Sequence, residues 1–141
     1  MRGPLDPVRR LFSVLVVEDN PGDAHLIREA FRECGDQCHL EFAETTTEAR
    51  QILAQQRFDL MLSDMGVRNG ETAEFIRSIR ENNRLRTMPV IVLSGSPDPR
   101  PAYLAGANAF ISKTMDMDEF FAKINALVHF WIHVAELPPA E

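Results

Sequence analysis

The chain has 141 residues, of which 45% are hydrophobic and 26% charged, and its formal net charge at pH 7 is −6. This size and composition fit one globular domain with one hydrophobic core. The acidic balance argues against a nucleic-acid-binding surface, and no apolar run approaches the roughly 20 residues of a membrane-spanning helix.

Two features bear on the cellular compartment. The two cysteines, Cys34 and Cys38, are too few for a disulfide framework or a complete zinc site. We therefore expect reduced thiols in a cytoplasmic protein. The pair Arg9-Arg10 precedes an apolar run that stops at Glu18-Asp19 with no small-residue cleavage site after it, which argues against a signal sequence.

Strands are predicted at five short apolar or alternating segments: residues 11–17, 39–43, 58–64, 89–93 and 109–112. The segment 58–64 is mostly apolar, as expected of a strand buried on both faces, and it ends in Asp64. We predict a flexible arm at residues 1–10, the folded domain at 11–137 and a tail at 138–141.

A helix is predicted after each strand. The first is marked by a capping residue, a proline, an acid for its positive end and a terminator: Asn20, Pro21, Asp23 and Gly35. Capping boxes mark the second and the last helices: Thr45 with Glu48, and Asp116 with Glu119.

The third helix carries apolar residues at helical spacing and ends at an asparagine pair: Phe75, Ile76, Ile79 and then Asn82-Asn83. Prolines between Ser94 and Pro101 restrict the fourth helix to residues 101–105, ended near Gly106. The last helix is expected to run to about Glu136.

Five strand–helix repeats with short connections predict an α/β fold. The parallel five-stranded sheet should have right-handed crossovers and helices on both faces. The expected strand order is 2-1-3-4-5, which is the flavodoxin-like doubly wound (βα)5 sandwich.

Polar side chains follow the ends of neighbouring strands in this fold. Glu18 and Asp19 follow the first strand and Asp64 ends the third, so three carboxylates should meet at one edge of the sheet. Ser94 ends the next strand along the sheet. Because clustered carboxylates repel one another, a divalent cation is the usual way to make such a cluster tolerable.

With these residues the chain resembles the receiver domain of two-component response regulators, the CheY-like superfamily. Four motifs carry the resemblance: VVEDN at 16–20, DLMLSD at 59–64, PVIVLSG at 89–95 and GANAFISK at 106–113. Each motif is weak alone, but all four occur in order at the ends of the first, third, fourth and fifth strands. The resemblance covers roughly residues 12–135.

The resemblance implies a role for each site residue. Asp64 would be the phosphoacceptor, taking a phosphoryl group from a histidine kinase or a phosphotransfer protein. Mg²⁺ or Mn²⁺ would be held by two acids, the phosphoacceptor and a backbone carbonyl: Glu18, Asp19, Asp64 and Gly66. Lys113 would contact the acyl phosphate. The protein would then be a signalling phosphoacceptor, capable only of self-phosphorylation and slow self-dephosphorylation, and not an enzyme.

The resemblance also implies a switch. Ser94 would donate its hydroxyl to the phosphoryl group, and Phe110 would then change rotamer and remodel the face built from the fourth helix, fifth strand and fifth helix. Compared with most family members, the loops 65–70 and 94–113 are short, and Thr114 replaces the proline usual after Lys113. These departures leave every reacting atom in place.

A narrower resemblance is to small single-domain regulators that accompany phytochrome-type histidine kinases, and it rests on the segments 18–20, 129–131 and 137–138. A first apolar stripe is expected to face the core: Phe120, Ile124, Leu127 and Trp131. A second stripe, Phe121, Val128 and Ile132, could pack inside the monomer or form a homodimer. His129 and His133 are four residues apart, with no third metal ligand apparent.

We expect a single-domain regulator that signals through a partner, with no output domain, membrane or nucleic-acid contact. The main alternative is a pseudo-receiver, an interaction or dimerisation module that works without phosphorylation. A flavodoxin-like cofactor binder would need a phosphate loop where Glu18-Asp19 stands, and a haloacid-dehalogenase-type phosphatase would need a carboxylate where Gly66 stands.

Overall fold

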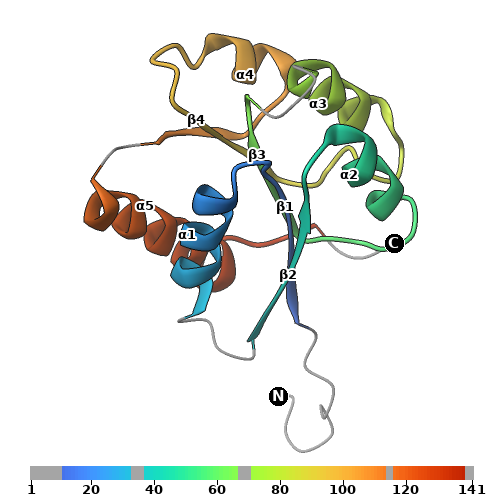
Figure 1. The fold of residues 1–141 in the computed structure, drawn as a ribbon. Helices are drawn as coiled ribbons and strands as arrows, with labels where there is room; N and C mark the ends of the chain where they lie inside the picture. Colours follow the sequence, from blue (N-terminus) through green and yellow to red (C-terminus); the bar gives the residue numbers. More distant parts are fainter. Residues whose placement is uncertain (1–10, 33–36, 67–70, 114–115, 139–141) are drawn as a thin grey trace, which may run out of the picture.

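The computed structural model describes residues 11–32, 37–66, 71–113 and 116–138 (Figure 1). Strands and helices alternate along the chain. The strands are β1 (Phe12–Val17), β2 (Cys38–Ala43), β3 (Leu60–Asp64), β4 (Val90–Ser94) and β5 (Ala109–Ser112). The helices are α1 (Pro21–Phe31), α2 (Thr46–Leu53), α3 (Thr72–Glu81), α4 (Arg100–Ala105) and α5 (Met117–His129), followed by the π-helical turn η3 (Phe130–Val134).

The five strands form one parallel sheet in the order β2-β1-β3-β4-β5, which confirms the predicted topology. In its register Val17 pairs with Ser63, Asp64 with Leu93, and Ser94 with Ser112. The carboxyl ends of β1, β3, β4 and β5 therefore lie along one edge of the sheet, where this class of fold places its ligands.

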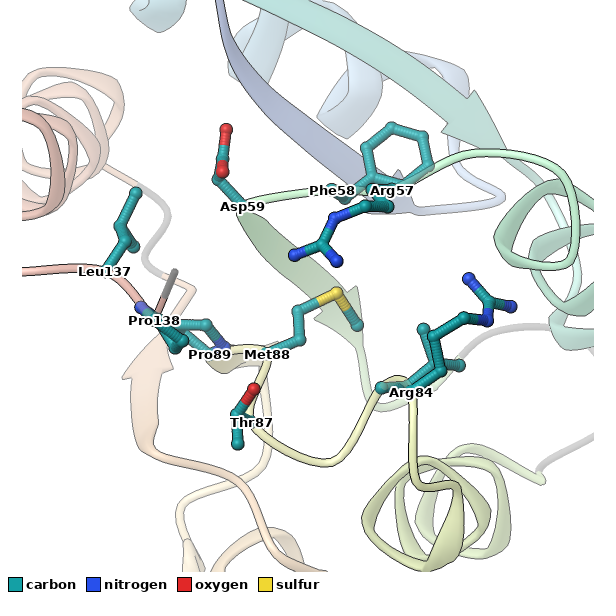
Figure 2. A pocket seen from close by; sticks show the side chains of 10 residues that line it. Arg57, Phe58, Asp59, Arg84, Thr87, Met88, Pro89, Leu137 and Pro138 are labelled. Atoms are coloured by element: carbon teal, nitrogen blue, oxygen red, sulfur yellow. The ribbon is translucent and has the colours of Figure 1, made fainter. Parts of the chain in front are cut away.

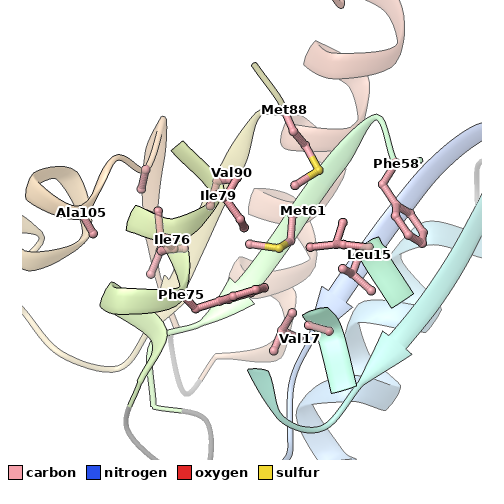
Figure 3. Close-up of a cluster of buried hydrophobic side chains, with 14 of the residues drawn as sticks. Leu15, Val17, Phe58, Met61, Phe75, Ile76, Ile79, Met88, Val90 and Ala105 are labelled. Atoms are coloured by element: carbon pink, nitrogen blue, oxygen red, sulfur yellow. The ribbon is translucent and has the colours of Figure 1, made fainter. Parts of the chain in front are cut away.

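Successive strand residues point to opposite faces, so the core has two halves. Leu15, Val17 and Met61 face α2, α3 and α4, where Phe75 and Ile76 of α3 cover them (Figure 3). Val14 and Val16 face the other way, toward α1 and α5. Because β1, β3 and β4 are buried on both faces, their sequences are mostly apolar rather than strictly alternating.

Three helices begin where the capping residues predict. The side chains of Asn20, Thr45 and Asp116 accept backbone N–H groups of the first turns of α1, α2 and α5. Glu48 completes the second cap by accepting the backbone N–H of Glu44 at 2.8 Å. These bonds satisfy donors that have no partner inside a helix. They also fix where each helix leaves the sheet edge.

The last helix was predicted to run to about Glu136, and helical backbone does extend to Val134, but its final turn is not α-helical. α5 ends at His129, and the backbone N–H of Ala135 bonds to the carbonyl of Phe130 at 2.8 Å, five residues back, which makes η3 a π-helical turn. Of the second stripe, Val128 is buried, and Phe121 and Ile132 pack partly against the core between the sheet and the helices α1 and α5.

Some predictions fall outside the described residues: the arm, the last residues of the tail, and Cys34 and Gly35 at the end of the first helix. Within the part of the chain that the structure describes, no helix is both long enough and apolar enough to cross a membrane.

Candidate functional site

Three carboxylates meet at the carboxyl edge of the sheet, as the sequence predicts. Glu18 and Asp19 directly follow β1, and Asp64 is the last residue of β3, its neighbour in the sheet. One oxygen from each lies within 4.8 Å of the other two. Glu18 is almost fully buried at 3% exposure, and its Oε2 accepts the backbone N–H of Asn20 at 3.1 Å.

Lys113, the residue directly after β5, brings a positive charge into this cluster. Its Nζ lies 3.0 Å from Glu18 Oε1, 2.9 Å from Asp64 Oδ1 and 2.7 Å from Asp23 Oδ2. The backbone N–H of Lys113 donates to the carbonyl of Ser94 at 2.8 Å, which holds the base of its side chain at the end of β4. The lysine therefore bridges three elements: the loop after β1, the end of β3 and the first turn of α1.

Burial and charge pull the site's pKa values apart. Burial raises the pKa of the Glu18 carboxyl, and the charge of Asp64 adds to that rise, although Lys113 and the N–H of Asn20 oppose it. For Lys113, burial lowers the pKa, but the bonds to Asp23, Asp64 and Glu18 together outweigh burial and raise its pKa far above the ordinary value. The ammonium of Lys113 therefore stays protonated, whereas burial disfavours the ionised form of Glu18.

Asp23 is a site residue that the sequence analysis missed. It was predicted only to complement the positive end of the first helix, and it does lie in the first turn of α1. The same turn also brings its carboxylate to Lys113. The available signal was its position four residues after Asp19, at the start of a helix that leaves the same sheet edge.

Thr72 was missed as well. Its buried hydroxyl donates to the backbone carbonyl of Asp64 at 3.3 Å and so ties the start of α3 to the end of β3. A threonine after a loop carries no sequence signal for such a contact, because the contact depends on where the loop returns.

The remaining predicted residues lie around the cluster. Ser94 is buried at the end of β4, where its Oγ accepts the backbone N–H of Ser96 at 3.0 Å. The backbone of Gly66 lies close to the carboxylate of Asp64, since a Cβ atom on Gly66 would lie 3.6 Å from Asp64 Oδ2. Phe110 on β5 is half-buried and packs against the core half that includes α3 and α4.

The oxygen-rich cluster fits a hard divalent cation, because Mg²⁺ and Mn²⁺ prefer carboxylate, carbonyl and water ligands. The burial of Glu18 tests whether this cluster suits a cation. It is buried among acids, its charged form is disfavoured, and Lys113 already provides one compensating charge. A divalent cation beside Glu18, Asp19 and Asp64 would offset the rest.

A second hollow lies at the opposite, amino-terminal edge of the sheet (Figure 2). Its walls include Arg57, Asp59 and Met88, and Leu137 and Pro138 reach it from beyond α5. Its volume is about 30 Å³, which is room for about one water molecule. This hollow is too small for a ligand, and Glu18, Asp19 and Asp64 do not line it.

Comparisons with known proteins agree with the geometry. The family model of the response regulator receiver domain matches residues 14–125. The response regulator Rcp1 of Synechocystis sp. is 26% identical over 137 residues, covering 90% of this chain and 93% of Rcp1. Rre1 of the same organism is 29% identical over 119 residues, covering 82% of this chain. The chain spans about half of Rre1, 51% of its length.

Solved structures are similar over almost the whole chain. The phosphorylated cyanobacterial phytochrome response regulator RcpA superposes with a TM-score of 0.86 at 26% identity, covering 92% of this chain and all (100%) of RcpA. The Mn²⁺-bound form of Rcp1 superposes with a TM-score of 0.82 over 90% of this chain and 99% of Rcp1. At 24% identity, that second likeness shows the shared fold.

Proposed function

Because the chain belongs to the response regulator receiver domain family, we propose that Asp64 accepts a phosphoryl group and that the protein signals through this modification. The observation that carries the proposal is the triple contact of Lys113 Nζ with Asp64, Glu18 and Asp23. It places a permanent positive charge beside one oxygen of the proposed nucleophile. Such a charge stabilises the negative oxygens of a transferring phosphoryl group.

The proposed reaction is a phosphoryl transfer to a carboxylate. A carboxylate oxygen of Asp64 attacks the phosphorus atom, the bond from phosphorus to the donor's leaving group breaks, and an acyl phosphate forms. Thr72 and the ladder partner Leu93 fix the backbone of Asp64, so its carboxylate presents a defined direction to the donor. Lys113 can follow the new phosphoryl oxygens because its amine has three donors on a flexible stem.

We propose that Glu18, Asp19, Asp64 and the carbonyl of Gly66 hold Mg²⁺ or Mn²⁺. The bound ion would supply charge that offsets the developing negative charge on the phosphoryl oxygens. Support comes from the proximity of the three carboxylates and from the raised pKa of Glu18. The known Mn²⁺-bound form of Rcp1 is consistent with this choice of ion.

Signal output would pass through Ser94 and Phe110 to the face made by α4, β5 and α5. Ser94 stands one strand from Asp64, and its hydroxyl could turn from Ser96 to a phosphoryl oxygen. This face carries exposed apolar side chains, with Tyr103 at 50% and Leu104 at 81% exposure, and an open groove of about 620 Å³ along β5 and α5. Such a surface suits a protein partner or a second copy of the chain.

The proposed phosphoryl donor is a sensor histidine kinase or a phosphotransfer protein, by analogy with the family. RcpA is described as a phytochrome response regulator, which makes a phytochrome-type kinase the first donor to test. We also propose that the protein works in the cytoplasm, where such kinases present their phosphohistidine.

Intact mass after incubation with acetyl phosphate tests this function. We expect one phosphoryl adduct that requires Mg²⁺ and disappears in Asp64→Asn. The matched control is Asp98→Asn, which removes an exposed carboxylate that pairs with Arg100 and is not part of the acidic cluster. Uptake that persists in Asp64→Asn would show that the acceptor is misassigned, and no adduct on the folded protein would favour the pseudo-receiver.

A further inference from the structure

Two histidines lie together at the end of the last helix, away from the carboxylates. His129 is the last residue of α5 and His133 lies in η3, and their ring centres are 5.2 Å apart with the planes at 45°. α5 begins at Met117, just after Lys113, so the pair lies roughly 18 Å along the helix axis from that start. The histidines are therefore separate from the acidic cluster.

Their separation matches two ligands of one metal ion. In a tetrahedral site the Zn–N bond is about 2.0–2.1 Å, and an imidazole nitrogen lies about 1.1 Å from its ring centre, so the two centres would be roughly 5.2 Å apart. The observed separation is 5.2 Å. A cation between the rings thus requires rotation of the imidazoles, with no movement of the helix backbone.

The surroundings suit a partly hydrated ion. Both imidazoles are exposed, and they border an open cavity of about 250 Å³ between α1 and α5 that Gln37 and Asn125 also line. The two amide side chains offer carbonyl oxygens that could bind the ion or its water ligands. Within the described residues, the two rings contact each other.

The π-helical turn gives the pair a second distinguishing feature. In a continuous α-helix, the α-helical pitch would set the direction of the His133 side chain relative to His129. η3 is wound more loosely, because the backbone N–H of Ala135 bonds to the carbonyl of Phe130, five residues back. Turns of this kind are rare and often occur at functional sites. Here the turn begins directly after His129 and contains His133, so its winding sets the relative direction of the two side chains.

We propose that His129 and His133 chelate a divalent transition cation such as Zn²⁺ or Cu²⁺. Imidazole nitrogen favours these ions over Mg²⁺, which prefers oxygen ligands and belongs to the acidic cluster. The chain would then hold two metal sites of different chemistry, and the histidine site would brace α5 against the last turn of the chain.

Titration calorimetry with Zn²⁺, on the full chain in saturating Mg²⁺, tests the proposal. We expect a one-to-one Zn²⁺ component that weakens by at least about tenfold in His129→Gln and in His133→Gln, because either change removes the chelate. The matched control is His25→Gln, an exposed histidine on α1, which should leave the component unchanged. A component that survives in the double variant, or that His25→Gln also removes, overturns the proposal, as does its absence from the wild type.

Electron paramagnetic resonance of the Cu²⁺-loaded wild type provides an independent measurement that needs no variant. Two equatorial nitrogen ligands are expected in the presence of Mg²⁺. A spectrum with oxygen ligands alone, or with one nitrogen, would overturn the chelate even if Zn²⁺ binds.

Discussion

Lys113 Nζ lies closer to Asp23, at 2.7 Å, than to the proposed phosphoacceptor Asp64, at 2.9 Å. The lysine is therefore shared with a carboxylate on α1 that would compete with an incoming phosphoryl group for the same ammonium. Asp23 also places a negative charge near the site that the phosphoryl group must enter.

Asp23→Asn should consequently speed phosphorylation. Removing one nearby negative charge and one competitor for Lys113 should raise the rate with acetyl phosphate by about three- to tenfold, which corresponds to roughly 0.7–1.4 kcal/mol. Phosphorylation rates by intact mass would check this. Glu29→Gln on the same helix, where Glu29 pairs with Arg32, is the charge-matched control. A slower Asp23→Asn protein would mean that Asp23 positions Lys113 rather than competing for it.

Lys113→Met should destabilise the metal-free protein by about 2 kcal/mol. The change leaves Glu18, Asp23 and Asp64 without their shared cation, and the cost is discounted from that of a fully buried pair because Lys113 is 19% exposed. Urea unfolding in EDTA measures the loss, and Mg²⁺ should restore part of it. Lys123→Met, which removes a bond to the carbonyl of Ser112, is the control. Equal stability of Lys113→Met and wild type in EDTA would contradict this account.

The contribution of Glu18 to the stability of the metal-free protein should fall as the pH rises above 4.5, the ordinary pKa of a glutamate. Its pKa is raised in the folded state, so the unfolded chain loses this proton first and is favoured over the interval between the two pKa values. The comparison of wild type with Glu18→Gln, by thermal unfolding in EDTA across pH 4 to 8, isolates this contribution. The stability difference between the two should move in favour of Glu18→Gln with rising pH. A constant difference would contradict the raised pKa.

Gly106→Ala should cost about 2–4 kcal/mol of stability. Gly106 ends α4 with φ at +117°, and a Cβ there would lie 2.7 Å from Cγ of Arg80. Arg80 donates to the carbonyls of Gly106, Arg86 and Met88, so displacing it leaves acceptors unsatisfied. Gly95→Ala is the control, because its added Cβ meets nothing within 4 Å. Similar urea midpoints for the two variants would show that Arg80 moves at little cost.

The fold could be predicted because each local signal agrees with the global pattern. The apolar runs ending at Val17, Asp64 and Ser94 are long enough for buried strands and too short for helices, and the caps place each helix start. Strand order then brings Glu18 and Asp64 together without any knowledge of side-chain contacts.

The missed features depend on contacts that no local pattern encodes. Asp23 reads as an ordinary acid of a first turn until Lys113, 90 residues later, reaches it. The π-helical winding of η3, where Trp131 and Ile132 pack partly against the core, could not be predicted because the sequence there continues a helical pattern. The roles of Ser94, Gly66 and Phe110 concern a phosphorylated state and stay predictions.

The position of Lys113 late in the chain has a consequence for folding. Its bond to Glu18 spans 95 residues, so the carboxylates of β1 and β3 emerge during synthesis well before their counter-charge. Contacts of such long range form late, because a large loop must close first. The acidic edge should therefore mature as one of the final events of folding, and a nascent chain halted before residue 113 would carry its negative charges without their lysine.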